Sequence, residues 1–161
     1  MMETDPHGAG QTPTAALIAH ILSRYHDTHR RELPELLALA RKVETSHATD
    51  PNTPHGLTQA LEAMIADLEE HMRREEEDVF ATLATGDASA GEGIAGLRHD
   101  HEGHEAALNR IAAITHGFRL PSYACHSWAR LYAGLGKLAE DLDEHRYLED
   151  SVLFPRLQAG Q

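Results

Sequence analysis

The chain has 161 residues, and its 26 acidic and 14 basic side chains give a formal net charge of −12. This acidity argues against nucleic-acid binding, which needs clustered positive charge, and no apolar run approaches the roughly 20 residues that cross a bilayer. The N-terminus has no secretory signal, and the single cysteine, Cys125, excludes a disulfide framework and a thiolate cluster, so we expect a cytoplasmic protein without a membrane partner. With 13 histidines in the chain, any metal must be held by imidazole and carboxylate groups.

The first helical pattern follows a short leader. Residues 1–12 contain proline and glycine without an apolar pattern, so we expect them to be flexible. An apolar stripe at helical spacing then begins and includes His26. Pro34 lacks an amide hydrogen and clashes with the carbonyl four residues back, so the helix is expected to break or kink there. A second helical segment should continue the stripe as far as His47.

Three further helices are expected along the chain. Apolar stripes cover about residues 57–83, 94–115 and 122–154, with small and turn-forming residues between them. Residues 85–93 form a loop of small residues, and no segment alternates as a strand would. Short loops make neighbouring helices antiparallel. The sequence therefore predicts an all-α, up-down four-helix bundle that occupies residues 13–158 as one domain.

One motif occurs twice. The stretches 68–83 and 142–157 share five landmarks (Leu, His, Glu, Phe and Leu) at the same spacing, and in each a glutamate follows the histidine by four residues, or one helical turn. These side chains lie on the apolar stripes, where a charged glutamate is costly unless it is paired or bound to metal. A solvated pair could arise once by chance, but two copies in phase with the core favour a metal site between helices. The four residues are His71, Glu75, His145 and Glu149.

The other helices must supply the remaining ligands. On a straight helix His26 and His47 would lie about 30 Å apart, at roughly 1.5 Å per residue. They can therefore share a site only if the chain turns back near Pro34. The in-phase candidates are Tyr25, His26, His29 and His47 in the first part of the chain and His101, His104 and Glu105 in the third helix.

Six segments match a known pattern: 20–36, 42–48, 56–58, 71–76, 99–102 and 144–157. In these segments, and over nearly all of residues 15–158, the chain resembles the hemerythrin-like (HHE) domain of the repair of iron centres (RIC) di-iron proteins, which are linked to nitrosative and oxidative stress. The resemblance implies a hemerythrin-like bundle whose first helix is broken near Pro34. It also implies two iron ions bridged by both glutamates and an oxo or hydroxo group. The ligands it implies are His26, His47, His71, Glu75, His101, His145 and Glu149.

Two departures from related proteins refine this expectation. RIC proteins look as though they carry a small N-terminal domain with a Cys-Cys pair, which this chain lacks, so an activity that needs those cysteines is either missing here or supplied by another protein. Oxygen-carrying hemerythrins have two histidines four apart on the third helix and pair histidine with aspartate on the fourth. Here Glu105 follows His101 by four residues, and the fourth helix carries Glu149. Both differences favour the repair type.

Imidazole and carboxylate ligands suit iron, manganese or zinc. The resemblance implies a stress-response protein that acts in iron-sulfur cluster repair. It would donate iron to iron-sulfur client proteins, or bind and reduce nitric oxide as an oxidoreductase. The alternatives are a module that reversibly binds or senses dioxygen, and a bundle that stores iron or zinc. Both a monomer and a homodimer are compatible with the sequence.

Overall fold

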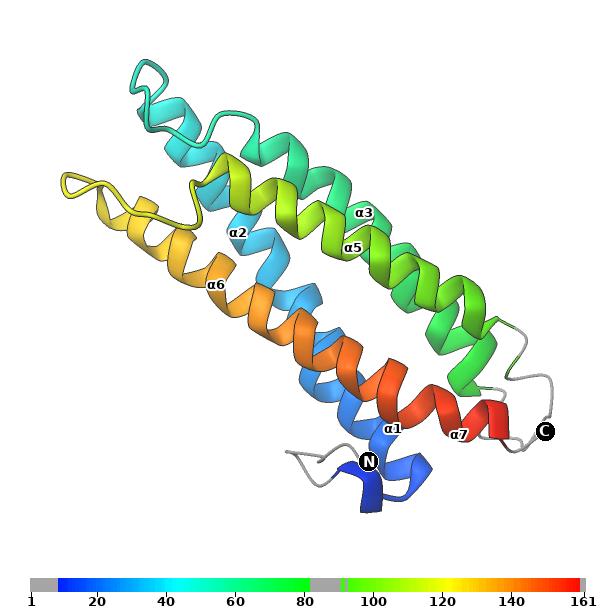
Figure 1. Ribbon diagram of the computed structural model, residues 1–161. Helices are drawn as coiled ribbons and strands as arrows, with labels where there is room; N and C mark the ends of the chain where they lie inside the picture. Colours follow the sequence, from blue (N-terminus) through cyan, green and yellow to red (C-terminus); the bar gives the residue numbers. More distant parts are fainter. Residues whose placement is uncertain (1–8, 82–90, 92, 160–161) are drawn as a thin grey trace.

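The computed structural model describes residues 9–81, 91 and 93–159. Over these residues the chain forms helices and turns without a strand, which confirms the expected all-α bundle. Four helical rods lie side by side, and successive rods run in opposite directions (Figure 1). No helix in the described part of the chain is long and apolar enough to cross a bilayer. The first rod consists of α1 (Thr14–Ile21), the π-helical segment η2 (Leu22–His26) and α2 (Asp27–Ser46). The second rod consists of α3 (Leu57–Arg74) and the π-helical segment η3 (Glu75–Phe80), and the third is α5 (Ile94–Ile114). The fourth rod consists of α6 (His126–Tyr147), the π-helical segment η5 (Leu148–Leu153) and α7 (Phe154–Ala159).

The first rod does not break at Pro34, which lies inside α2. The side chain of Pro34 is exposed, whereas Leu33 and Leu36 beside it are buried. Because proline has no backbone N–H, the backbone carbonyl four residues before Pro34 lacks its usual hydrogen-bond donor. That carbonyl lies on the same face of the helix as Pro34, where water can donate the missing hydrogen bond. Unwinding the helix there would instead expose two buried leucines, at about 1.5–3 kcal/mol each. The predicted break was therefore wrong, because burial of the inner face outweighs the local cost of the proline.

The turn between the first two rods is fixed by a side chain of α2. The carboxylate of Glu44 accepts hydrogen bonds from the backbone amides of Gly56, at 2.7 Å, and Thr58, at 2.9 Å, and from the Thr58 hydroxyl. These amides lie at the start of α3, where the backbone N–H groups have no hydrogen-bond acceptor within the helix itself. A negative charge at this end also interacts favourably with the helix dipole. Glu44 thus sets how α3 returns along α2.

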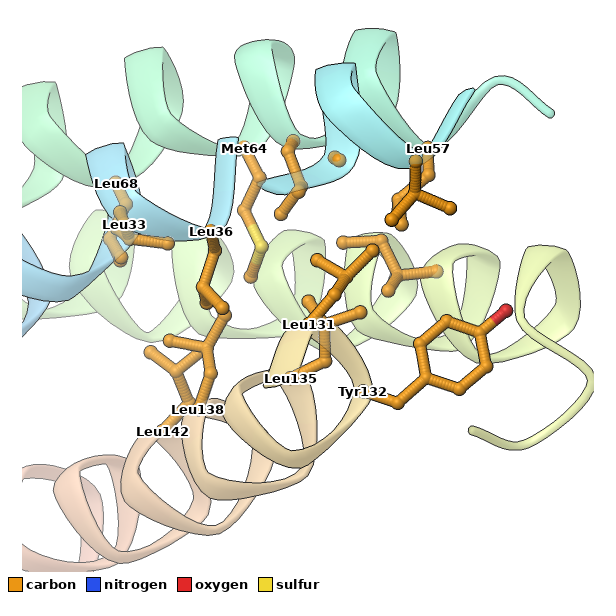
Figure 2. Packing of buried hydrophobic residues seen from close by; sticks show 14 of the residues in the cluster. Leu33, Leu36, Leu57, Met64, Leu68, Leu131, Tyr132, Leu135, Leu138 and Leu142 are labelled. Carbon is orange, nitrogen blue, oxygen red and sulfur yellow. The ribbon is translucent and has the colours of Figure 1, made fainter. Parts of the chain in front are cut away.

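Two apolar clusters fill the interior of the bundle. In the larger one, Leu36 from α2, Met64 from α3 and Leu135 from α6 point into a common space (Figure 2). On the first rod Tyr25 belongs to the small cluster and Leu33 to the large one, and buried histidines lie between them. The large cluster is Leu33, Leu36, Ala40, Val43, Leu57, Leu61, Met64, Leu68, Met72, Ile111, Trp128, Leu131, Tyr132, Leu135, Leu138 and Leu142; the small cluster is Leu17, Ile21, Tyr25, Val79, Phe80, Ile94, Leu97, Leu148, Val152, Leu153, Phe154 and Leu157.

Part of the expected leader is bound to the fourth rod. Residues 1–8 lie outside the described residues, as do the end of the expected second helix from residue 82 on and, of the expected 85–93 loop, residues 85–90 and 92. The short 3-10 turn η1 (Ala9–Gln11) precedes the first rod. Arg156 of α7 donates hydrogen bonds to the backbone carbonyls of Thr12, at 2.6 Å, and Gly10, at 3.3 Å. These contacts hold the last residues of the leader against the end of the bundle.

Candidate metal centre

Six buried histidine and glutamate side chains meet between the two apolar clusters. They form two overlapping groups of four, and in each group one nitrogen or oxygen atom from every residue lies within 4.8 Å of the others. Both groups contain the same two glutamates, and each adds two histidines of its own. We call the groups position A (His26, His145, Glu75 and Glu149) and position B (His71, His101, Glu75 and Glu149).

Three of the four rods change from α-helical to π-helical hydrogen bonding at this centre. The segment η2 ends at His26, η3 begins at Glu75, and η5 contains Glu149. A π-turn inserts a residue into the helix and re-aims the side chains that follow, and such turns are frequent at functional sites. Local helix geometry is therefore altered at the positions from which candidate ligands project.

The two His-Glu pairs repeat one geometry. His71 Nε2 lies 3.0 Å from Glu75 Oε1, and His145 Nε2 lies 3.0 Å from Glu149 Oε2. The other histidine of each position completes the arrangement: His26 Nε2 is 3.4 Å from Glu75 Oε1, and His101 Nε2 is 2.9 Å from Glu149 Oε1. Glu149 thus directs Oε2 toward position A and Oε1 toward position B, which is how a carboxylate bridges two metal ions.

The donor atoms fit a pair of cations. Within the part of the chain that the structure describes, five of them are buried without a hydrogen-bond partner: Nε2 of His26, Nε2 of His71, both carboxylate oxygens of Glu75, and Oε1 of Glu149. Leaving such atoms unpaired costs about 1–3 kcal/mol each, and a cation between them removes that cost. Burial and the neighbouring Glu149 charge raise the pKa of Glu75 well above its usual value, so the two carboxylates ionise together only with positive charge nearby. Imidazole and carboxylate donors suit iron, manganese or zinc.

Three carboxylates outside this centre hold the outer nitrogens of three of its histidines. His26 Nδ1–H donates to Glu76 at 2.7 Å, and the Nδ1–H groups of His71 and His101 donate to Asp100 and Asp150, each at 2.9 Å. Such partners orient the imidazole and make it a stronger ligand. Each carboxylate is in turn bound by an arginine: Glu76 by Arg30, Asp100 by Arg74 and Asp150 by Arg146.

The sequence predictions did not identify these three carboxylates. A signal was nevertheless present in the sequence. Glu76 directly follows Glu75, Asp150 directly follows Glu149, and Asp100 directly precedes His101. Neighbouring positions on a helix point in directions about 100° apart, so a residue beside one ligand can reach the back of a ligand on another helix.

The fourth histidine, His145, has a different partner. Its Nδ1 lies 3.3 Å from Nε2 of His29, and the ring of Tyr25 stacks on its face at 5.2 Å between centroids. Burial, reinforced by the neighbouring His145 and His26, lowers the pKa of His29 to about 3, so His29 is neutral at physiological pH. His29 lies directly behind a candidate ligand and faces that imidazole.

His47 does not join the cluster. It follows the last residue of α2, with Nε2 3.4 Å from Cys125 Sγ and its ring centroid 5.0 Å from that of Trp128. Because α2 is continuous through Pro34, the 20 residues between His26 and His47 span about 30 Å. Of the seven ligands that the resemblance implied, the structure brings six together and places His47 at the other end of the bundle.

A cavity of about 270 Å³ leads from the surface between α5 and α6 to this centre. Its walls include the apolar side chains of Leu108 and Leu142. The imidazoles of His71, His101 and His145 also line it, so it touches both positions. The volume is ample for a diatomic molecule, whereas a protein partner could reach only its mouth.

Comparison with known proteins gives concordant findings. The family described as hemerythrin HHE cation binding domain matches residues 17–157. An iron-sulfur cluster repair protein YtfE from Pectobacterium carotovorum subsp. carotovorum (strain PC1) is 38% identical over 152 residues, which cover 94% of this chain and 69% of that protein. A protein of the same name from Yersinia pestis (strain Pestoides F) is 37% identical over 164 residues, which cover 99% of this chain and 74% of that protein.

Proposed function

The chain belongs to the hemerythrin HHE cation-binding family, and on that premise we propose that it is a di-iron protein of iron-sulfur cluster repair, which donates iron to damaged client proteins in the cytoplasm. The observation that carries the proposal is the pair of four-residue groups that share Glu75 and Glu149. The name shared by the similar proteins supports the repair role.

In this proposal His26 and His145 would hold one iron ion at position A, His71 and His101 would hold a second at position B, and Glu75 and Glu149 would serve both. Bound iron supplies a metal that can change between the ferrous and ferric states and can be passed to an acceptor. The protein's own residues orient the ligands: Glu76, Asp100 and Asp150 fix three imidazoles from behind. The apolar clusters on either side limit the access of water to the centre.

A second candidate function is the binding and reduction of nitric oxide, and the cavity between α5 and α6 favours it. Nitric oxide and dioxygen are small and weakly polar, and a cavity that apolar side chains line admits them. Dioxygen that binds reversibly would enter through the same cavity between α5 and α6. A stable oxygenated spectrum that reverses on degassing would favour dioxygen binding over repair.

The proposal is tested by counting iron and following its transfer. Purified protein is loaded with ferrous iron without oxygen and then mixed with an apo iron-sulfur protein and inorganic sulfide under reducing conditions, and the cluster absorbance of the acceptor reports the repair. We expect two irons per chain and recovery of the cluster absorbance. The Glu75→Ala, Glu149→Ala double variant should bind neither iron, because both positions lose two ligands.

The control is Glu77→Ala, because Glu77 lies two residues from Glu75 but is exposed and binds Arg73. This variant should keep two irons. Binding of much less than two irons by the wild-type protein would refute the di-iron centre. Two bound irons that never reach the acceptor would refute the donor role. Zinc that binds both positions as tightly as iron, and is not released to the acceptor, would point to metal storage.

A further inference from the structure

The four candidate histidine ligands are not held alike. Both histidines of position B, His71 and His101, donate their outer N–H to a carboxylate that an arginine binds. In position A only His26 has such a partner, Glu76. His145 faces the imidazole of His29 instead. The asymmetry therefore lies in a single ligand of a single position.

The partner of His145 carries no charge. When His145 binds a cation through Nε2, its Nδ1 carries the proton and donates to Nε2 of His29. The other nitrogen of His29, Nδ1, is buried without a hydrogen-bond partner among the described residues, so none of their carboxylates binds His29 from behind. Asp141, which lies one turn before His145 on α6, is bound to Arg24 at 2.8 Å and Lys137 at 2.9 Å.

The charge of the partner changes the strength of the ligand. A carboxylate that accepts the outer N–H pulls the proton away from the ring, which raises the electron density on the coordinating nitrogen and strengthens its bond to the metal. A neutral imidazole has this effect to a much smaller extent. Replacing such an outer partner typically changes metal affinity about 10–100-fold. Position A has one imidazole strengthened in this way and position B has two.

We propose that the two metal positions have unequal affinity, and that the iron held by His26 and His145 is the one this protein gives up first, because His29 replaces a carboxylate behind His145. His29 is in this view a positioning residue that makes one iron labile. The inference rests on the proposed function, since it assumes two bound irons of which one is donated. The cavity touches His145 as well as His71 and His101, so iron can leave either position through it toward an acceptor at its mouth, and relative affinity sets the order.

The test measures the occupancy of each position separately. Iron-loaded protein is equilibrated without oxygen against a graded series of a ferrous chelator. Crystals are grown at each step, and anomalous diffraction at the iron edge gives the occupancy at each position. We expect position A to empty at a chelator concentration about 10–100-fold lower than position B. Equal emptying, or earlier emptying of position B, overturns the inference.

A matched pair of variants isolates the charge. In His29→Glu a carboxylate of similar reach replaces the imidazole, and it should bring the emptying point of position A close to that of position B. His29→Gln offers an uncharged acceptor at the same place and should keep the wild-type gap. If the two variants empty position A at the same chelator concentration, the charge is not the cause and the inference fails.

A variant in the other position guards against misfolding of His29→Glu. Asp150→Asn removes the carboxylate behind His101 and should weaken iron binding at position B. The difference between the chelator concentrations that empty the two positions should therefore become smaller. If Asp150→Asn leaves the difference between these two chelator concentrations unchanged, the inference is also overturned. Binding of two irons with the wrong order of release refutes only this inference, whereas failure to bind two irons refutes the proposed function.

Discussion

The large apolar cluster and the centre of six histidine and glutamate side chains are neighbouring parts of one bundle interior. In the cluster, side chains such as Leu61 and Leu131 are stabilised by contact alone, and any well-packed neighbour serves. In the metal centre each inner polar atom faces the site, and the outer nitrogen of each histidine needs a partner from another rod. The comparison shows that this buried polar layer depends on a hydrogen-bond network outside it, and the proposed cations would satisfy its inner atoms.

Removing a ligand should break the metal centre and leave the apolar part intact. His26→Ala deletes one of the two histidines of position A, and we expect iron binding there to weaken by more than about 100-fold, beyond the effect of an outer partner. Iron content after anaerobic loading and desalting should fall from two to one per chain. His47→Ala is the control, because His47 packs against Trp128 at the other end of α2. Loss of iron from that control would contradict the six-ligand assignment.

Truncation in the apolar cluster should have the opposite effect. Leu61 is completely buried on α3, and Leu61→Ala should lower the free energy of unfolding by about 2–5 kcal/mol because it leaves a cavity. Urea denaturation of the metal-free protein measures this loss, and the iron stoichiometry at low temperature should not change. Leu120→Ala, at a position 40% exposed, should cost far less. Equal losses in the two variants would mean that the cluster is not the main source of stability.

A smaller change in the outer network should weaken the metal without removing a ligand. Glu76→Gln takes the negative charge from behind His26, and we expect an affinity loss of about 10–100-fold at position A. Competition with a ferrous chelator measures it. Glu69→Gln is the matched control, since Glu69 binds the same Arg30 but contacts no ligand. Similar losses in both variants would indicate that Arg30, and not the charge behind His26, matters.

The metal-free protein should lose stability in mild acid. Burial, with His71 and His101 nearby, lowers the pKa of His104 to about 4, and that of His29 is about 3. Between the unfolded pKa of about 6.5 and these values the unfolded chain holds protons that the folded protein does not. Stability therefore falls as the pH drops from 6.5 toward 4, by about 1.4 kcal/mol per pH unit for each histidine.

His104→Leu should reduce this slope by the contribution of one histidine, measured by urea denaturation across the pH range. His99→Leu is the control, because the His99 side chain is 83% exposed. A slope that is identical in wild-type protein and His104→Leu would show that His104 does not resist protonation in the folded state.

Most of the centre could be predicted from helical spacing. The four-residue step between histidine and glutamate, repeated in phase with the core, placed His71, Glu75, His145 and Glu149 on inner faces, and the structure brings them together. The resemblance to a family selected His101 over its in-phase neighbour His104. In the structure His101 belongs to position B, and His104 packs against the ring of His71 at 4.9 Å between centroids.

The two errors, the break at Pro34 and the role of His47, have one cause. Both treated the local penalty of a proline as decisive, and a shared site for His26 and His47 depended on the chain turning back there. In the structure α2 packs against both α3 and α6 along its inner face, with Leu33 and Leu36 buried on either side of the proline. Long-range packing outweighed the local preference.

The sequence by itself determined the four helices, the inner face of each and the two His-Glu pairs, because these features depend on residues three or four apart. Only the tertiary structure decided which partner stands behind each imidazole. Glu76 reaches His26 across 50 residues of sequence, and His29 reaches His145 across 116. Such contacts form only when separate rods pack in one register, and they create the difference between positions A and B.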